Sequence, residues 1–198
     1  MKKNTYRKWL SLALPPWIQL YFYSFMVTLA TYEFLRLSFL VWNWSLFKSI
    51  ATIDIIKAIF WGLRFDACAI SILFLPTFLI VLLLSFVAPQ RIVKTVWVTA
   101  LAIIHIPFLV LNVIDIEFFN FAGRRFTLSS LFIFQEAQGK MSGFLSTYLP
   151  GTLAGILLII VFVWGIRKRT SGLDLAVYSK WKHLLIHFFI LLMIVIMG

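Results

Sequence analysis

Two short stretches hold the residues of this chain that are best suited to bind a charged ligand. Residues 115–125 read Asp-Ile-Glu-Phe-Phe-Asn-Phe-Ala-Gly-Arg-Arg, so two acids, three Phe and an Arg pair fall within eleven residues. Arg binds phosphate through two parallel hydrogen bonds, and aromatic rings are enriched at headgroup depth in membranes. The second stretch, Arg64-Phe65-Asp66, begins another apolar run. These stretches point to contact with phosphate at a membrane surface.

Residue patterns for catalysis or metal binding are missing from the sequence. It has no Gly-rich phosphate loop, nucleophile elbow or paired-carboxylate motif. His183 and His187 have the four-residue spacing of two metal ligands on one helix face, but no carboxylate or Cys accompanies them. An interfacial His pair is therefore favoured over a metal site. His105 lies within an apolar run, where a buried, hydrogen-bonded His is favoured over a functional one.

Composition places the chain among polytopic helical membrane proteins. Of its 198 residues, 62% are hydrophobic and only 13% are charged, whereas soluble domains carry about 25% charged residues. The net charge of +11 does not indicate nucleic-acid binding, because the basic residues fall between apolar runs rather than on one soluble face. Such an excess is typical of the positive-inside signal and of contact with anionic phospholipid headgroups.

The apolar runs predict an all-α bundle of five transmembrane helices. Each run is close to or longer than the roughly 20 residues that a helix needs to cross a bilayer, and the expected helices cover about 14–42, 56–88, 95–114, 149–166 and 183–198. Few charges and several Phe in the long segment between the third and fourth helices indicate an interfacial helix there. No soluble domain is expected within residues 1–198.

Lys and Arg in the short loops predict the orientation. With the N-terminus in the cytoplasm, eleven basic residues lie in the inner segments and six in the outer ones, and only Arg36 remains, near the outer end of the first helix. The positive-inside rule therefore favours an N-in, C-out arrangement in the cytoplasmic (inner) membrane.

This orientation brings charged residues of three helices to one depth, near the outer edge. Glu33 and Arg36 are three apart and can meet on one helical face. Arg64 and Asp66 are two apart and cannot face each other, so each needs a partner elsewhere, for which Asp115 and Glu117 are available. A lipid headgroup-binding site and an ordinary interhelix polar cluster are equally compatible with the full set of Glu33, Arg36, Arg64, Asp66, Asp115, Glu117, Arg124 and Arg125.

The chain resembles the membrane domain of the lipoteichoic acid synthase-like phosphoglycerol transferases, which are membrane-anchored members of the sulfatase and alkaline phosphatase superfamily. The resemblance rests on Gly62-Leu-Arg-Phe-Asp before a long apolar run, then Asp115-Ile-Glu-Phe-Phe-Asn-Phe, then Arg125-Phe-Thr-Leu. It extends along the whole chain in helix number and loop lengths. The matching charged positions are Arg64, Asp66, Asp115, Glu117, Arg124 and Arg125.

The resemblance implies an N-terminal membrane module of a phosphoglycerol or related phospho-headgroup transferase. Members of this family carry a C-terminal extracytoplasmic catalytic domain with a Thr nucleophile and a divalent metal. Neither a catalytic residue nor a cofactor is expected within this chain, so the resemblance fits a fragment whose partner is that domain. The alternative is a catalytically inactive, truncated relative that serves as a membrane scaffold or regulatory subunit. A small transporter is less favoured, because polar residues inside the membrane are few.

Overall fold

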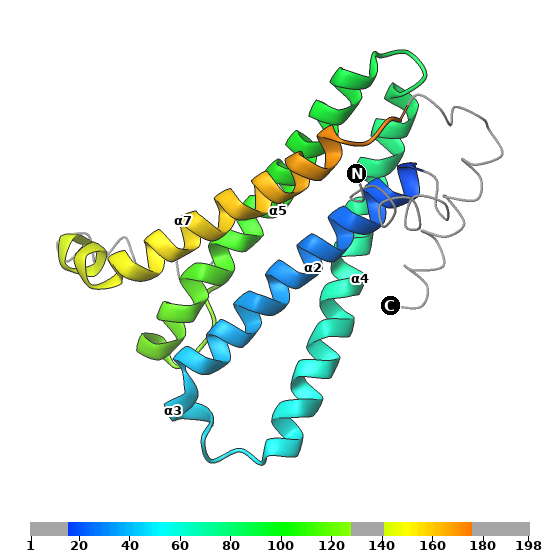
Figure 1. Cartoon of the computed structure of the whole chain (residues 1–198). Coiled ribbons are helices and arrows are strands. Elements are labelled where there is room, and N and C mark those ends of the chain that lie inside the picture. Colours follow the sequence, from blue (N-terminus) through cyan, green and yellow to red (C-terminus); the bar gives the residue numbers. More distant parts are fainter. Residues whose placement is uncertain (1–15, 128–140, 176–198) are drawn as a thin grey trace, which may run out of the picture.

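Five helices make up the described part of the chain in this computed structural model. The structure describes residues 16–127 and 141–175. The helices are α2 (Pro16–Trp42), the short α3 (Trp44–Phe47), α4 (Thr52–Leu84), α5 (Gln90–Ala122) and α7 (Met141–Ser171) (Figure 1). No strand is present within these two ranges. The all-α prediction is confirmed for them.

The other three long helices pack around α2. Helix α2 contacts α4, α5 and α7, and α5 in turn contacts α4 and α7. Helix α4 and helix α5 form a hairpin at the upper end of Figure 1, whereas α3 and the start of α4 lie at its lower end. We call the lower end the α3 end, and the opposite one, where α4 ends and α5 begins, the hairpin end.

Aromatic rings fill the space between α2, α4 and α5. Phe74 and Trp97 are fully buried, and their rings meet edge to face with centroids 5.9 Å apart. Tyr21 of α2 makes edge-to-face contacts with Phe74 and Phe78 of α4 at 5.5 and 5.8 Å. Such pairs add to the apolar contacts of a bundle. The indole of Trp97 donates a hydrogen bond of 3.1 Å to Ser24 Oγ, which satisfies both polar groups in the core.

Large apolar side chains also cover the outside of the bundle. Val87, Phe65 and Ile103 expose 84, 71 and 68% of their surface, a pattern that water would penalise and hydrocarbon would not. Four helices, α2, α4, α5 and α7, contain segments long and apolar enough to cross a membrane. The chain is a multi-pass membrane protein.

Several helix limits differ from those expected. Helix α4 spans Thr52–Leu84 instead of 56–88, and α7 spans Met141–Ser171 instead of 149–166. Helix α5 spans Gln90–Ala122, so residues 115–122 continue the third helix, which was expected to end at 114. The interfacial helix expected before residue 141 and the fifth helix expected at 183–198 lie outside the described residues.

A glycine, and not the end of the apolar run, ends α5. Gly123 has φ 64°, a left-handed conformation that costs glycine little, and its N–H donates to the carbonyl of Phe119 at 2.9 Å. Leaving the hydrocarbon does not break a helix, because its backbone hydrogen bonds are internal. Asp115, Glu117, Phe118 and Phe119 therefore lie on a helix, in a fixed register with the bundle.

Candidate functional site: two polar clusters toward the α3 end

A partly buried ion pair joins α2 to α4. Arg36 of α2 donates through Nη2 to Asp66 Oδ2 at 2.5 Å and to the carbonyl of Gly62 at 3.3 Å. Glu33, one helical turn before Arg36, places Oε1 3.7 Å from Arg36 Nε. The side chains of Asp66, Glu33 and Arg36 expose only 12, 18 and 26% of their surface. We call Glu33, Arg36 and Asp66 the α2–α4 cluster.

Gly62 makes room for the Arg36 guanidinium. A Cβ atom at position 62 would lie 2.3 Å from Arg36 Nη1 and 2.4 Å from Cζ, well inside van der Waals contact. The guanidinium therefore lies directly on the backbone of α4, where Asp66 is one turn further along. Glycine allows this close approach, since a Cβ atom would force the guanidinium to shift, whereas the helix itself would favour almost any other residue.

The two charged residues of the Arg64-Phe65-Asp66 stretch face different ways, as their spacing predicted. Asp66 turns into the bundle, and its partner is Arg36 of α2, whereas the sequence had pointed to Asp115 or Glu117 of the third helix. Arg64 is exposed, and its guanidinium lies over the ring of Trp61 on the same helix, 5.5 Å from the centroid. Contact between Arg64 and an acid of the first or third helix stays a prediction.

Asp115 folds the segment after Gly123 back onto the bundle. Its Oδ1 accepts a hydrogen bond of 2.6 Å from the backbone N–H of Phe126, and its Oδ2 lies 3.6 Å from Arg125 Nε. The Arg125 guanidinium also lies over the ring of Phe39 of α2, 5.1 Å from the centroid. We call Phe39, Asp115, Arg125 and Phe126 the α5-end cluster.

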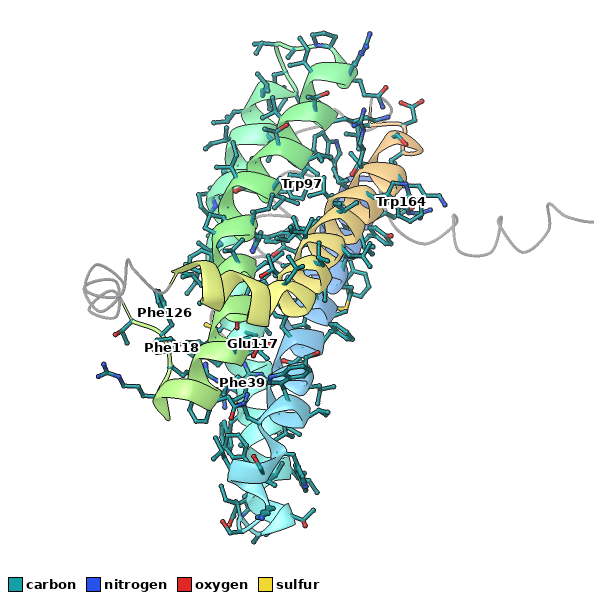
Figure 2. All side chains as sticks on the ribbon, turned by 90° about the vertical axis from the view of Figure 1, so that its left-hand side faces the viewer. Phe39, Trp97, Glu117, Phe118, Phe126 and Trp164 are labelled. Atoms are coloured by element: carbon teal, nitrogen blue, oxygen red, sulfur yellow. The ribbon has the colours of Figure 1, made fainter. Side chains whose placement is uncertain are left out.

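Aromatic rings surround this second cluster. Phe39, Phe47 and Phe119 bring α2, α3 and α5 together, with centroids 4.9 to 6.0 Å apart. Phe118 and Phe126 meet edge to face at 5.3 Å. Figure 2 shows Phe39, Glu117, Phe118 and Phe126 gathered around the end of α5.

Glu117 and Asn43 fix the same end of the bundle. Glu117 accepts a hydrogen bond of 3.2 Å from the indole of Trp42, so it joins α5 to the end of α2. Asn43, fully buried between α2 and α3, donates to the carbonyl of Ile116 at 3.0 Å. Both contacts set the position of α5 relative to α2 close to the α5-end cluster.

The two arginines of the Gly-Arg-Arg step have different environments. Arg125 is held by Asp115 and Phe39, although 61% of its side chain is exposed. Arg124, next to it, is exposed, and so are Gly123 and Thr127. The cluster thus holds a short segment with its backbone anchored and two exposed arginines, an arrangement able to bind an anion.

Several residues that shape these clusters could not be identified from the sequence. Phe39, Trp42 and Asn43 were not singled out, because their role depends on the rotation of α2 against α5. Gly62 was part of a sequence motif. Its contact with the Arg36 guanidinium can be recognised only once the position of α2 relative to α4 is known. A glycine four residues before an acid on an apolar helix was the one available signal.

The structure describes one of the three histidines of the chain, His105. His105 is fully buried, shares a hydrogen bond of 3.3 Å with Tyr32 through Nδ1, and lies against Phe74. It is the buried, hydrogen-bonded His that was favoured, while His183 and His187 lie outside the described residues. Within residues 16–127 and 141–175, no three His, Cys, Asp or Glu side chains are grouped as metal ligands would be.

The site is therefore two interhelix clusters, one inside the bundle and one where α5 ends, the second with exposed arginines. Comparison of the chain with protein-family models, with curated proteins and with solved structures found no match.

Proposed function

We propose that this chain is the N-terminal membrane module of a phosphoglycerol transferase, or of a related phospho-headgroup transferase. It would act on phospholipid at the outer face of the cytoplasmic membrane, with the catalytic groups and their divalent metal in an extracytoplasmic domain. The observation that carries the proposal is the anchoring of the Gly-Arg-Arg step by Asp115. The resemblance in the Gly62–Asp66 and Asp115–Phe121 stretches supplies the reaction class.

The α5-end cluster supports a headgroup-binding role for Arg124, with Arg125 beside it. A loop that merely crossed the interface would need no carboxylate to hold its backbone. Asp115 accepts from the N–H of Phe126 and approaches Arg125, so the turn between them is fixed from both sides. Anchoring of this kind lowers the entropic cost of binding a phosphate in one orientation. The rings of Phe118 and Phe126 suit headgroup depth.

The charge distribution supports the N-in orientation that this function needs. Arg91 and Lys94 begin α5, and Arg167, Lys168 and Arg169 end α7, so five basic residues gather at the hairpin end. Basic residues of this kind favour the cytoplasmic side. The α3 end, with both clusters toward it, then faces outward.

The experiment measures headgroup release from phosphatidylglycerol in membranes of cells that produce the full gene product. We expect Arg124→Ala to reduce turnover about tenfold or more, and Arg124→Lys to fall between it and the wild type, because Lys keeps the charge but loses the planar fork. Lys57→Ala is the matched control, since Lys57 is an exposed cation toward the same end whose salt bridge is local, to Asp54.

Two results would contradict a specific headgroup site. If Arg124→Lys equals the wild type while Arg124→Ala fails, the residue supplies only general charge. If neither substitution changes turnover, Arg124 has no substrate role.

A non-enzymatic scaffold or regulatory subunit is the second candidate function. The α2–α4 cluster favours it, because a partly buried ion pair that lies against a glycine fixes how two helices pack. Two results together would support this candidate over the first. The wild-type protein would release no headgroup, and deletion of its gene would impair another membrane enzyme.

A further inference from the structure

A groove runs between α5 and α7 from the hairpin end toward the middle of the bundle. Its volume is about 560 Å³. One wall is a single face of α5, since Val98, Ala102 and Ile106 recur at helical spacing. The other wall is a face of α7 that includes Val163 and Arg167. Short side chains such as Ala102 leave part of the space between the two helices unfilled.

The mouth of the groove is cationic, and the rest of its lining is mainly apolar, with Thr95 and Thr99 among the α5 residues. Lys94 of α5 and Arg167 of α7 both line it, at the hairpin end, whereas Ile103, Ile106 and Pro107 line it further in. Residues 94 and 107 are separated by about 20 Å along a helix, at about 1.5 Å per residue. That length accommodates a charged group followed by the acyl chain of one leaflet, whose hydrocarbon is about 15 Å thick.

The three basic residues that end α7 point in different directions. Arg169 turns to α2, where it donates to Gln19 Oε1 at 3.4 Å and lies over Tyr23. Lys168 lies over the ring of Trp164, 4.5 Å from its centroid, and neither of these residues lines the groove. Figure 2 places Trp164 on α7 away from Trp97 in the core. Arg167 is the member of this set that faces the groove.

Lys94 lies at the mouth of the groove on the opposite helix, α5. Its Nζ donates to the carbonyl of Ser171 at 3.2 Å, which caps the end of α7 and holds the two helices together. An ammonium has three donors, so this bond leaves others for an anion. The residues that line the groove include two cations and no acid.

We infer that this groove binds an anionic phospholipid from the leaflet at the hairpin end. Its phosphate lies between Lys94 and Arg167, and one acyl chain lies along the apolar wall toward Pro107. Basic pockets between transmembrane helices recognise anionic headgroups in this way. The site is at the opposite end of the bundle from Arg124, so it is independent of the proposed transferase function and survives if that function is wrong.

The test counts phosphatidylglycerol molecules bound to the purified full chain in detergent by native mass spectrometry. We expect Arg167→Gln to weaken the tightest lipid about fivefold to tenfold, as loss of one cation near an anionic headgroup should. Lys168→Gln, which removes the same charge from the next residue but not from the groove, is expected to leave that affinity unchanged. Ile106→Trp, which fills the apolar part without altering charge, is expected to displace the lipid.

Two further probes separate lipid from other occupants. Soluble glycerol phosphate, which has the phosphate without the acyl chains, is expected not to compete at concentrations where phosphatidylglycerol does. A photoactivatable residue in place of Ile103, which is 68% exposed, is expected to capture lipid.

Four outcomes would overturn the inference. Equal loss from Arg167→Gln and Lys168→Gln would mean general attraction to anionic lipid. If both Arg167→Gln and Ile106→Trp keep the wild-type affinity for phosphatidylglycerol and the wild-type thermal stability, no lipid site exists here. Competition by glycerol phosphate would indicate a phosphate site without a lipid. Capture of a second copy, or of another segment of the same chain, at position 103 would identify a protein occupant.

Discussion

The guanidinium of Arg36 lies on the bare backbone of Gly62, and Asp66 accepts its hydrogen bond from one turn further along α4. One arginine on α2 thus uses two positions of α4, a glycine for space and an acid for charge. Removing one partner of a buried pair leaves the other charge without compensation, which is costly. The contact should therefore matter more for stability than the exposed ion pairs of the chain.

The first prediction tests that ion pair. Asp66→Asn is expected to lower the free energy of unfolding by about 2 kcal/mol, below the roughly 3–5 kcal/mol for breaking a fully buried pair, because 26% of the Arg36 side chain is exposed. The matched control is Asp54→Asn, which breaks a pair with Lys57 whose side chains are both about 60% exposed. That change should stay within about 0.5 kcal/mol. Thermal unfolding in detergent, followed by Trp fluorescence, measures both, and equal shifts would contradict the prediction.

The second prediction concerns Gly62 as the seat of Arg36. Gly62→Ala is expected to destabilise the wild-type chain, because the added methyl would overlap the guanidinium. With Arg36→Ala already present, the same change should stabilise by up to about 1 kcal/mol, since alanine favours a helix over glycine by that amount. A double-mutant cycle in the same unfolding assay detects this change of sign. Additive effects would show that Gly62 and Arg36 are not coupled.

What could be predicted from the sequence was local. The spacing of Glu33 and Arg36 places them on one helical face, and their ion pair follows from that spacing alone. Runs without charge likewise mark the membrane-crossing segments of α2, α4, α5 and α7. Each depends on residues within a few turns of one another.

What could not be predicted depends on how one helix is rotated against another. The partner of Asp66 is Arg36 because α2 presents that face to α4, which no spacing within either helix reveals. The end of α5 was placed too early because the apolar run stops at residue 114, whereas the helix stops only where Gly123 changes the backbone direction. Hydropathy indicates which part of a helix lies in hydrocarbon, but it does not indicate where the helical hydrogen bonding ends.

The third prediction concerns Gly123. Replacing it with Ala is expected to cost about 1 kcal/mol, because its φ of 64° is unfavourable for a residue with a Cβ atom. The cost would be pure backbone strain, since a Cβ at this position meets nothing within 4 Å. Gly123→Asn should cost less, as Asn tolerates this conformation better. If Ala and Asn are equally harmful in thermal unfolding, side-chain crowding and not backbone strain is responsible.

The fourth prediction separates the two contacts of Asp115. Asp115→Asn keeps an acceptor for the N–H of Phe126 but loses the charge that attracts Arg125, whereas Asp115→Ala loses both. Trypsin cleavage after Arg124 and Arg125 is therefore expected to be fastest in the Ala variant, intermediate in the Asn variant and slowest in the wild type. Mass spectrometry of the timed digest gives the rates. Identical rates for all three proteins would mean that Asp115 does not hold this segment in place.

The last prediction concerns orientation. Cys68 is the single cysteine of the chain, so its replacement by Ala provides a background for single cysteines at exposed positions. With the hairpin end in the cytoplasm, cysteines replacing Lys57 and Arg124 should react with a membrane-impermeant maleimide in intact cells. Those replacing Arg91 and Lys168 should react only after the membrane is opened. All four positions are exposed in the folded chain, so differences in labelling report sidedness and not burial.

The reverse pattern would place the arginines of the α5-end cluster in the cytoplasm and remove the basis for headgroup binding at the outer surface. The groove between α5 and α7 would then take its lipid from the outer leaflet, because its position depends on the helices and not on which side they face.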